Sequence, residues 1–340
     1  MIEEYIILLA DIHANDTALA AVIQDAFARY NGRLLRFWFL GDLFGRGPDP
    51  ELAWDRLMKL KPEASVVGNH DWFITQHTEK DKCVNTYEND TDRPPHYIGV
   101  NVNHDDCWVW EQHRATVLMM EKKLWLNGSN QFQIGSAEAY INHLPVVHVP
   151  RPGIFLVHGG LEVKKHKLSP PNPAVEPDTY WSDHWRKFAW GYVKKRDDAQ
   201  LTIKVMQWLH QYRPSNPNLF IEKAAFASWQ QPGLIIVGHW HVRRLFENGD
   251  FTNINLDTEY RLMTMAEKPT LISPGSVGFP NGDNRACNAC YALLKLQNGI
   301  PNTVTFHAVE FDRAAVRTRM KNKNYPHDLI NRLCRPGETI

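Results

Sequence analysis

Five short apolar runs are spread along the chain, and each is followed directly by a glycine or a polar turn. Runs of this length between turn residues predict buried strands. After the first run, apolar residues recur at i, i+3, i+4 and i+7, which is the spacing of one buried helix face. The five predicted strands are Tyr5–Ala10, Leu34–Leu40, Ala64–Val67, Ile154–Val157 and Leu234–Val237.

Two helices are expected between the first three strands. Asn15 or Asp16 is the expected N-cap of the first helix, because short polar side chains accept hydrogen bonds from the first helical N–H groups. The second helix spans about Pro50–Leu60, with Asp49 as its cap and a proline at its first position. This alternation of strands and helices predicts parallel strands in an α/β sheet.

The rest of the chain departs from this alternation in two ways. Polar and proline-rich stretches at about 76–150 and 161–232 are predicted to be insertions, which either cover a site or pack at the periphery. Further apolar runs near the C-terminus are expected to be antiparallel strands that close a second sheet. They are Thr270–Ser273, Tyr291–Leu296 and Thr303–Val309.

Composition is that of an ordinary soluble protein, with 43% hydrophobic and 22% charged residues. We expect residues 1–340 to form a single domain that carries the two insertions.

The formal net charge of +0 favours neither nucleic acid nor an anionic membrane as a partner. An N-terminus without a basic region favours a cytoplasmic location. Five cysteines, an odd number, argue against a disulfide framework.

Polar side chains that can bind metals follow the five strands. The carboxyl ends of such strands meet at a crevice along one edge of the sheet. The candidate ligands are Asp11, His13, Asp42, Asn69, His158, His239 and His241. Oxygen and imidazole ligands without thiolate suit Mn, Fe, Zn or Co better than Ca or Mg. Two such divalent or trivalent ions could clamp a phosphoryl oxygen and hold a hydroxide for in-line attack, and Mn is the ion expected to serve in vitro.

The residues next to these ligands suggest how a reaction would proceed. Asp42 is the lone acid at its strand end, and a carboxylate can bridge two cations where an imidazole cannot. If Asn69 is a ligand, His70 lies just outside the metal pair. It could then donate a proton or stabilise charge on the phosphoryl group. Asp71 could orient the His70 ring.

Five motifs of this chain closely resemble those of the calcineurin-like metallophosphoesterase superfamily, in the same order. The motifs are Asp11-Ile12-His13, Gly41-Asp42, Gly68-Asn69-His70-Asp71, His158-Gly159 and Gly238-His239-Trp240-His241. The resemblance covers about residues 1–75, 153–160 and 233–310. It implies a four-layer α-β-β-α sandwich of two mixed sheets, with a dinuclear metal site between the sheets.

The same resemblance implies a role for each matching residue. One metal would be held by Asp11, His13 and His241. The other would be held by Asn69, His158 and His239. Asp42 would bridge the two ions, and His70 would be the catalytic histidine.

Residues 45–50 and 273–278 look like the bacterial branch of this superfamily, whose members are usually known only as phosphoesterases. Arg46 departs from the tyrosine expected there. It stands where the Ser/Thr phosphoprotein phosphatases place an arginine. A guanidinium at this position could pair bidentately with phosphate oxygens, or it could form a salt bridge that holds the loop.

We therefore predict a dinuclear metal-dependent phosphohydrolase that cleaves small or moderate-sized phosphomonoesters or phosphodiesters by attack of a metal-bridging hydroxide. Arg46 favours monoesters, because they carry an additional anionic oxygen. One alternative is hydrolysis of nucleotides, either dinucleoside polyphosphates or cyclic nucleotides, with Trp181 or Trp185 stacking a base. The others are a Ser/Thr protein phosphatase and a metal-bound scaffold without catalysis. No membrane partner is expected, and the oligomeric state is left open.

Overall fold

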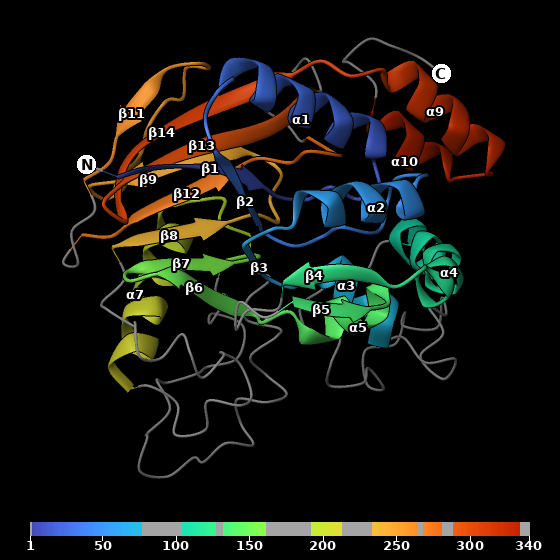
Figure 1. Cartoon of the computed structure of the whole chain (residues 1–340), viewed down its shortest axis with the longest axis horizontal. Helices are drawn as coiled ribbons and strands as arrows, with labels where there is room; N and C mark the ends of the chain where they lie inside the picture. The colour runs from blue at the N-terminus through green and yellow to red at the C-terminus, as the bar shows by residue number, and fades with distance from the viewer. Residues whose placement is uncertain are drawn as a thin grey trace.

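The computed structural model describes residues 2–76, 104–126, 132–160, 192–212, 233–263, 268–280 and 288–333. Two six-stranded sheets of mixed parallel and antiparallel strands form its centre. Figure 1 shows helices α1 and α2 on the side of the first sheet and α7 beyond the second sheet. The predicted α/β sandwich of two mixed sheets is therefore confirmed.

The first sheet has the strand order β11-β14-β13-β1-β2-β3. Its strands are β1 (Glu3–Leu9), β2 (Leu35–Phe39), β3 (Ala64–Ser65), β11 (Glu259–Arg261), β13 (Ala289–Gln297) and β14 (Ile300–Val309). The pairs β1–β2 and β2–β3 are parallel, as predicted. β13 and β14 are antiparallel to each other, but β13 pairs with β1, so both strands belong to this sheet rather than closing the second one. Apolar runs specify strands but not which distant edge supplies the hydrogen bonds, so that part of the prediction was wrong.

The second sheet has the strand order β10-β9-β12-β8-β7-β6. Its strands are β6 (Val147–Arg151), β7 (Ile154–Val157), β8 (Leu234–Val237), β9 (Arg243–Glu247), β10 (Asp250–Phe251) and β12 (Thr270–Pro274). Parallel pairing of β7, β8 and β12 brings the carboxyl ends of these strands to one edge. β6 belongs to this sheet, so the central fold resumes before the predicted end of the first insertion.

Alternating side chains of β1 divide the core into layers. Ile6 and Leu8 belong to the apolar layer between the two sheets, together with residues of β7, β8 and β12. Ile7 and Leu9 lie on the opposite face, in the cluster that contains the apolar face of α1. All four are fully buried. Each such side chain contributes about 1.5–3 kcal/mol relative to exposure, which explains why these strands are apolar on both faces.

The helices between the parallel strands are α1 (Asp16–Arg29) and α2 (Pro50–Leu60). The Asn15 side chain accepts a hydrogen bond from the N–H of Ala18 at 3.1 Å, which confirms the predicted cap of α1. Asp49 occupies the N-cap position of α2, but its side chain makes no capping hydrogen bond. The carboxylate instead accepts from the guanidinium of Arg319, so this part of the capping prediction was wrong.

Arg319 belongs to the C-terminal helical segment, which consists of α9 (Arg313–Asn322) and α10 (His327–Asn331). Figure 1 shows both helices beside the ends of α1 and α2. The Tyr325 hydroxyl donates to the carbonyl of Gly47 at 2.8 Å. The Lys323 ammonium donates to the next carbonyl, that of Pro48. The C-terminal segment therefore holds the loop that connects β2 to α2.

The described parts of the two predicted insertions form helices and a small hairpin. In the first, the elements are α4 (His104–Met119), β4 (Lys123–Leu126), β5 (Phe132–Gly135) and α5 (Ala137–His143), which follow α3 (Asn69–Gln76). The second contributes α7 (Arg196–Tyr212). Residues 161–191 and 213–232 lie outside the described residues. No described helix combines the length and the apolar composition needed to cross a bilayer.

Candidate metal centre

Left-handed backbone conformations mark the loops that follow the strands. Five of the seven candidate ligands have positive φ angles: Asp11 (54°), His13 (49°), Asp42 (59°), His239 (65°) and His241 (62°). Residues other than glycine rarely adopt this conformation, which costs about 1–3 kcal/mol and persists only where the surroundings impose it. The chain therefore accepts backbone strain at positions whose side chains lie close together.

Hydrogen bonds between neighbouring loops impose this conformation. The N–H of Asp11 donates to the carbonyl of Gly41 at 3.0 Å, and the N–H of His13 donates to the carbonyl of Asp42 at 2.9 Å. The loop after β1 thus runs beside the loop after β2. From the opposite side, the N–H of Gly278 donates to the carbonyl of Asp11 at 2.9 Å. The loop after β1 is consequently held between two other segments of the chain.

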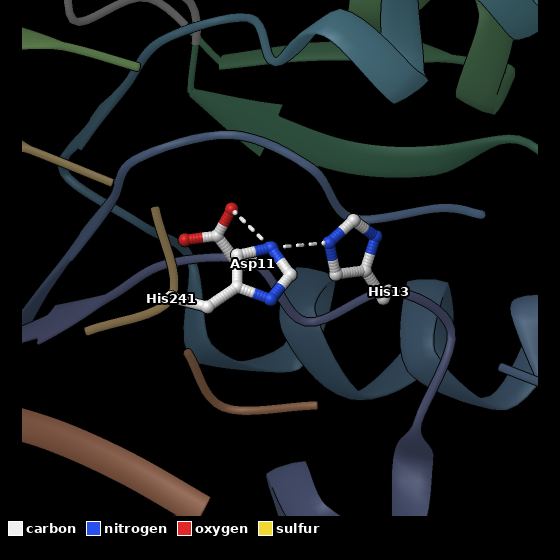
Figure 2. A group of neighbouring side chains, drawn as sticks. All are labelled: Asp11, His13 and His241. Carbon is white, nitrogen blue, oxygen red and sulfur yellow. Dashed lines mark hydrogen bonds and ion pairs between the residues drawn. The ribbon is translucent and has the colours of Figure 1, made fainter. Parts of the chain in front are cut away.

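A first cluster of buried ligand atoms is formed by Asp11, His13 and His241 (Figure 2). The Nε2 atoms of His13 and His241 are 3.0 Å apart. The same Nε2 atom of His241 is 3.3 Å from Oδ1 of Asp11. The three side chains come from the ends of β1 and β8, which lie in different sheets, so the cluster forms only when the sheets pack together.

The hydrogen bonds of these two histidines show that the cluster fits a cation. Nδ1 of His13 is 3.1 Å from the carbonyl oxygen of Phe44, and Nδ1 of His241 is 2.5 Å from that of Phe279. A carbonyl only accepts, so both Nδ1 atoms carry hydrogen. In neutral rings, both Nε2 atoms then direct lone pairs at each other and at a carboxylate. A cation between them would satisfy all three groups, which is the usual arrangement of metal-binding histidines.

A second cluster of ligand atoms lies around His158, and the same hydrogen-bond argument applies to it. Nδ1 of His158 is 2.6 Å from the carbonyl oxygen of Leu40, which leaves Nε2 as an acceptor in the neutral ring. This Nε2 lies 3.1 Å from Oδ1 of Asn69, 3.2 Å from Nδ1 of His239 and 3.3 Å from Oδ2 of Asp42. In that neutral state oxygen and nitrogen lone pairs again converge, and the ligand set suits Mn, Fe, Zn or Co.

Asp42 lies between the two clusters. Its Oδ2 is 3.3 Å from Nε2 of His158 and 3.7 Å from Nε2 of His13. Its Oδ1 accepts a hydrogen bond from the backbone N–H of His70 at 2.8 Å. Gly68 permits this approach, because a Cβ atom there would lie 2.1 Å from Oδ1 of Asp42. The Asp42 carboxylate therefore lies close to a ring nitrogen of each cluster.

Burial and the two carboxylates determine which histidines carry charge. Burial would lower the pKa of His158, but the charges of Asp42 and Asp11 outweigh it and raise this pKa to about 9. Burial lowers the pKa values of His13 and His239 well below the usual value. Those two rings are therefore neutral near neutral pH, which is the state in which histidine binds metals.

His70 is buried beside the first cluster, with its ring centroid 4.7 Å from that of His13. The expected partner of its ring, Asp71, makes other hydrogen bonds. The Asp71 carboxylate accepts from the backbone N–H groups of Phe44 at 3.0 Å and Gly68 at 3.4 Å. Consecutive residues on a helix do not face each other, so the prediction that Asp71 orients the His70 ring is wrong. Burial and the charge of Asp42 raise the pKa of Asp71 to about 7.

Arg46 itself has a left-handed backbone conformation, with a φ of 56°, and is partly buried. Its positive charge affects the pKa values of three histidines of the site. After burial, the positive charge of Arg46 is a cause of the lowered pKa in His13, His70 and His239. The charge of Arg46 therefore favours the neutral form of these three rings.

Two aromatic residues at the site were not predicted from the sequence. Trp110 of α4 donates a hydrogen bond from Nε1 to Nδ1 of His70 at 2.8 Å. The ring of Tyr192 stacks on that of His239, with centroids 4.4 Å apart, and Nζ of Lys194 lies 4.4 Å from the Tyr192 centroid. Both aromatic residues lie in segments without a motif, far in sequence from their partners. No periodicity or local spacing could have indicated these contacts.

Known proteins are similar to this chain in sequence and in fold. The family model of the calcineurin-like phosphoesterases matches residues 5–243. The fold is similar to that of a metallophosphoesterase from Sphaerobacter thermophilus, with a TM-score of 0.59, 22% identity and coverage of 98% of this chain and 99% of that one. A hypothetical protein from Pyrococcus horikoshii OT3 gives a TM-score of 0.55 at 16% identity, with the same two coverages. An uncharacterized protein of Methanocaldococcus jannaschii is 35% identical over 74 residues, which are 22% of this chain and 29% of that protein.

Proposed function

The chain belongs to the calcineurin-like phosphoesterase family, and on this premise we propose that it is a dinuclear metal-dependent hydrolase of phosphate esters. The observation that carries the proposal is the position of Asp42 between two clusters of inward-facing histidine nitrogens. Asp42 is a member of two of the three-residue clusters, as a ligand shared by two ions would be. The proposed ions are Mn, Fe, Zn or Co, because the ligands are oxygen and imidazole nitrogen.

The ligand roles follow from the two clusters. One ion would be held by Asp11, His13 and His241. The other would be held by Asn69, His158 and His239, with Asp42 shared between them. When bound, two such ions would stabilise charge on the phosphoryl oxygens and supply a hydroxide nucleophile near neutral pH.

The remaining residues of the site would bind and orient the ester. The guanidinium of Arg46 would pair with the anionic phosphate oxygens, because its planar fork matches their geometry. His70 would donate a hydrogen bond or a proton from its position beside His13 and Asp42. Arg46 lies in the loop that follows Asp42, and His70 follows Asn69 in the first turn of α3, so substrate and ions would be positioned together.

The direct test of this function is metal-dependent turnover of simple esters. We expect protein stripped of metal to be inactive on p-nitrophenyl phosphate and its bis-ester, and to regain turnover when Mn²⁺ is resupplied. The expected stoichiometry is two ions per chain, measured by elemental analysis of the reloaded protein. A larger kcat/KM on the monoester would support the preference assigned to Arg46.

Two outcomes would contradict the proposal. Turnover that survives complete metal removal would exclude the metal-dependent mechanism. A protein that binds two ions but hydrolyses neither these esters nor a panel of nucleotides would instead favour the non-catalytic scaffold. Circular dichroism of the stripped and reloaded samples shows whether lost activity reflects lost folding.

The Arg46→Ala variant is expected to distinguish monoesters from diesters. Hydrogen bonds to charged groups contribute about 1.5–3 kcal/mol, so KM for p-nitrophenyl phosphate should rise by about tenfold or more. The bis-ester has fewer anionic oxygens and should be less affected. Arg36→Ala is a suitable control, because Arg36 forms a half-exposed ion pair with Glu63 away from the site. Equal losses on both esters would show that Arg46 does not recognise the terminal charge.

Nucleotide hydrolysis is the second candidate function. Trp181 and Trp185, which suggested it, lie outside the described residues. The observation that now favours it is the pair formed by Tyr192 and Lys194 beside His239. Tyr192 is 47% exposed, so an aromatic surface and a cation adjoin the proposed ligand. Such a pair suits a substrate with a second phosphate or a base, and the nucleotide panel would reveal this preference.

A further inference from the structure

Trp110 reaches the metal centre from α4, within a part of the chain that carries no metal ligand. Its side chain is 2% exposed and lies parallel to the Phe73 ring, with centroids 4.6 Å apart. The indole ring meets the His70 ring edge to face, and its Nε1–H donates to Nδ1 of His70 at 2.8 Å. Packing and a hydrogen bond therefore fix the two rings relative to each other.

The direction of this hydrogen bond determines where the proton of His70 lies. An indole N–H can donate but cannot accept, so Nδ1 of His70 must be the acceptor and carries no hydrogen. The proton of the neutral ring is then on Nε2. On the adjacent loop Gly45 faces that atom, and a Cβ there would lie only 2.5 Å away. The carboxylate of Asp71 is engaged by backbone N–H groups.

A second residue of α4, one turn after Trp110, holds the same loop. Nδ1 of His113 accepts the N–H of Gly45 at 3.1 Å. Its Nε2 lies 2.9 Å from the hydroxyl of Tyr325, which donates onward to the carbonyl of Gly47. The helix thus contacts both the His70 ring and the loop that carries Arg46. This arrangement makes α4 a structural part of the site and not only a cover.

We propose that Trp110 is a positioning residue that holds His70 as the Nε2–H tautomer, so that His70 donates a hydrogen bond to a phosphoryl oxygen and does not protonate the leaving group. The chemical reason is that Nδ1 has no proton, so loss of the Nε2 proton would leave an anionic ring. A neutral imidazole N–H is a good hydrogen-bond donor but a poor acid. The role of His70 in this inference rests on the proposed function, whereas its tautomer does not.

The tautomer can be measured without catalysis, by ¹⁵N NMR of metal-free protein labelled at histidine. The His70 signals are identified by their loss in the His70→Ala variant. We expect the wild-type protein to show a protonated Nε2 and an unprotonated Nδ1 for His70. In Trp110→Phe, which keeps a ring against Phe73 but removes the N–H, the Nδ1–H form should become populated. A proton on Nδ1 in the wild-type protein would overturn the proposal, and so would an unchanged tautomer in Trp110→Phe.

Kinetics of the same variant test the role of the hydrogen bond. With Mn²⁺ bound, Trp110→Phe should lower kcat by up to about tenfold, the effect of one hydrogen bond, and leave KM within about twofold. Trp125→Phe is the matched control, because Trp125 is equally buried but lies in β4 and its Nε1 has no hydrogen-bond partner among the described residues. An equal loss of kcat in both variants would show that Trp110 acts only through packing.

A comparison of leaving groups tests how His70 acts. If His70 contacts a phosphoryl oxygen, Trp110→Phe and His70→Ala should each lower kcat by the same factor on p-nitrophenyl phosphate and phenyl phosphate. A larger loss on phenyl phosphate, whose phenoxide is the poorer leaving group, would show that His70 protonates the leaving oxygen and would overturn the assigned role.

If Trp110→Phe does not fold, the wild-type NMR spectrum alone decides the tautomer. An Nε2–H tautomer in a protein that hydrolyses no ester would support the tautomer assignment and contradict the proposed function.

Discussion

Asp42→Asn is expected to lose bound metal and activity together. The carboxylate of Asp42 faces Nε2 of both His13 and His158, at 3.7 Å and 3.3 Å, so it is the residue placed to be shared by two ions. A carboxamide has one oxygen and no charge, and it cannot replace a bridging carboxylate. Metal ions contribute several kcal/mol to phosphoryl transfer, and each 1.36 kcal/mol changes the rate tenfold. We therefore expect kcat/KM to fall by about 10³-fold or more.

Elemental analysis and ester hydrolysis of the same purified sample would check this result, with at most one ion expected per chain. The control is Asp49→Asn, which also neutralises a buried carboxylate but affects the contact with Arg319 instead of the metal centre. That variant should lose some stability and keep both ions. Two ions and wild-type activity in Asp42→Asn would rule out the bridging role of Asp42.

His70→Ala is expected to keep both ions and lose rate. The His70 ring is not among the proposed ligands, and its backbone N–H, which donates to Oδ1 of Asp42, remains in the variant. Removing one hydrogen-bond donor that stabilises charge in the transition state lowers kcat by about 10²–10³-fold. The loss should therefore appear in kcat at an unchanged metal content, which distinguishes His70 from every proposed ligand.

The control for this variant is His148→Ala, because His148 is also a buried histidine but its Nδ1 contacts the backbone carbonyl of Ser65 in the first sheet. Its kcat should stay close to wild type even if its melting temperature falls. A wild-type kcat in His70→Ala would remove His70 from the mechanism. Loss of an ion in that variant would instead place His70 among the ligands.

The local pattern of the sequence determined the parts of this protein that depend on neighbouring residues. Apolar runs specified β1, β2, β7 and β8, and the side chain of Asn15 specified the start of α1. Alternation with helices required the first three strands to be parallel, which directs their carboxyl ends to one edge. The candidate ligands all follow such strands, so the sequence alone was enough to predict that they converge. Their individual roles as ligands stay predictions.

Only the tertiary structure decided the features that depend on contacts between distant segments. The pairing of β13 with β1, the bond from Arg319 to Asp49 and the contact of Trp110 with His70 join residues far apart in the chain. Asp71 shows the opposite case, because it adjoins His70 in sequence but its carboxylate accepts hydrogen bonds from the backbone of Phe44 and Gly68. Periodicity and spacing report which face of an element is buried. They do not report which distant side chain meets that face, because the packing of the whole chain selects that partner.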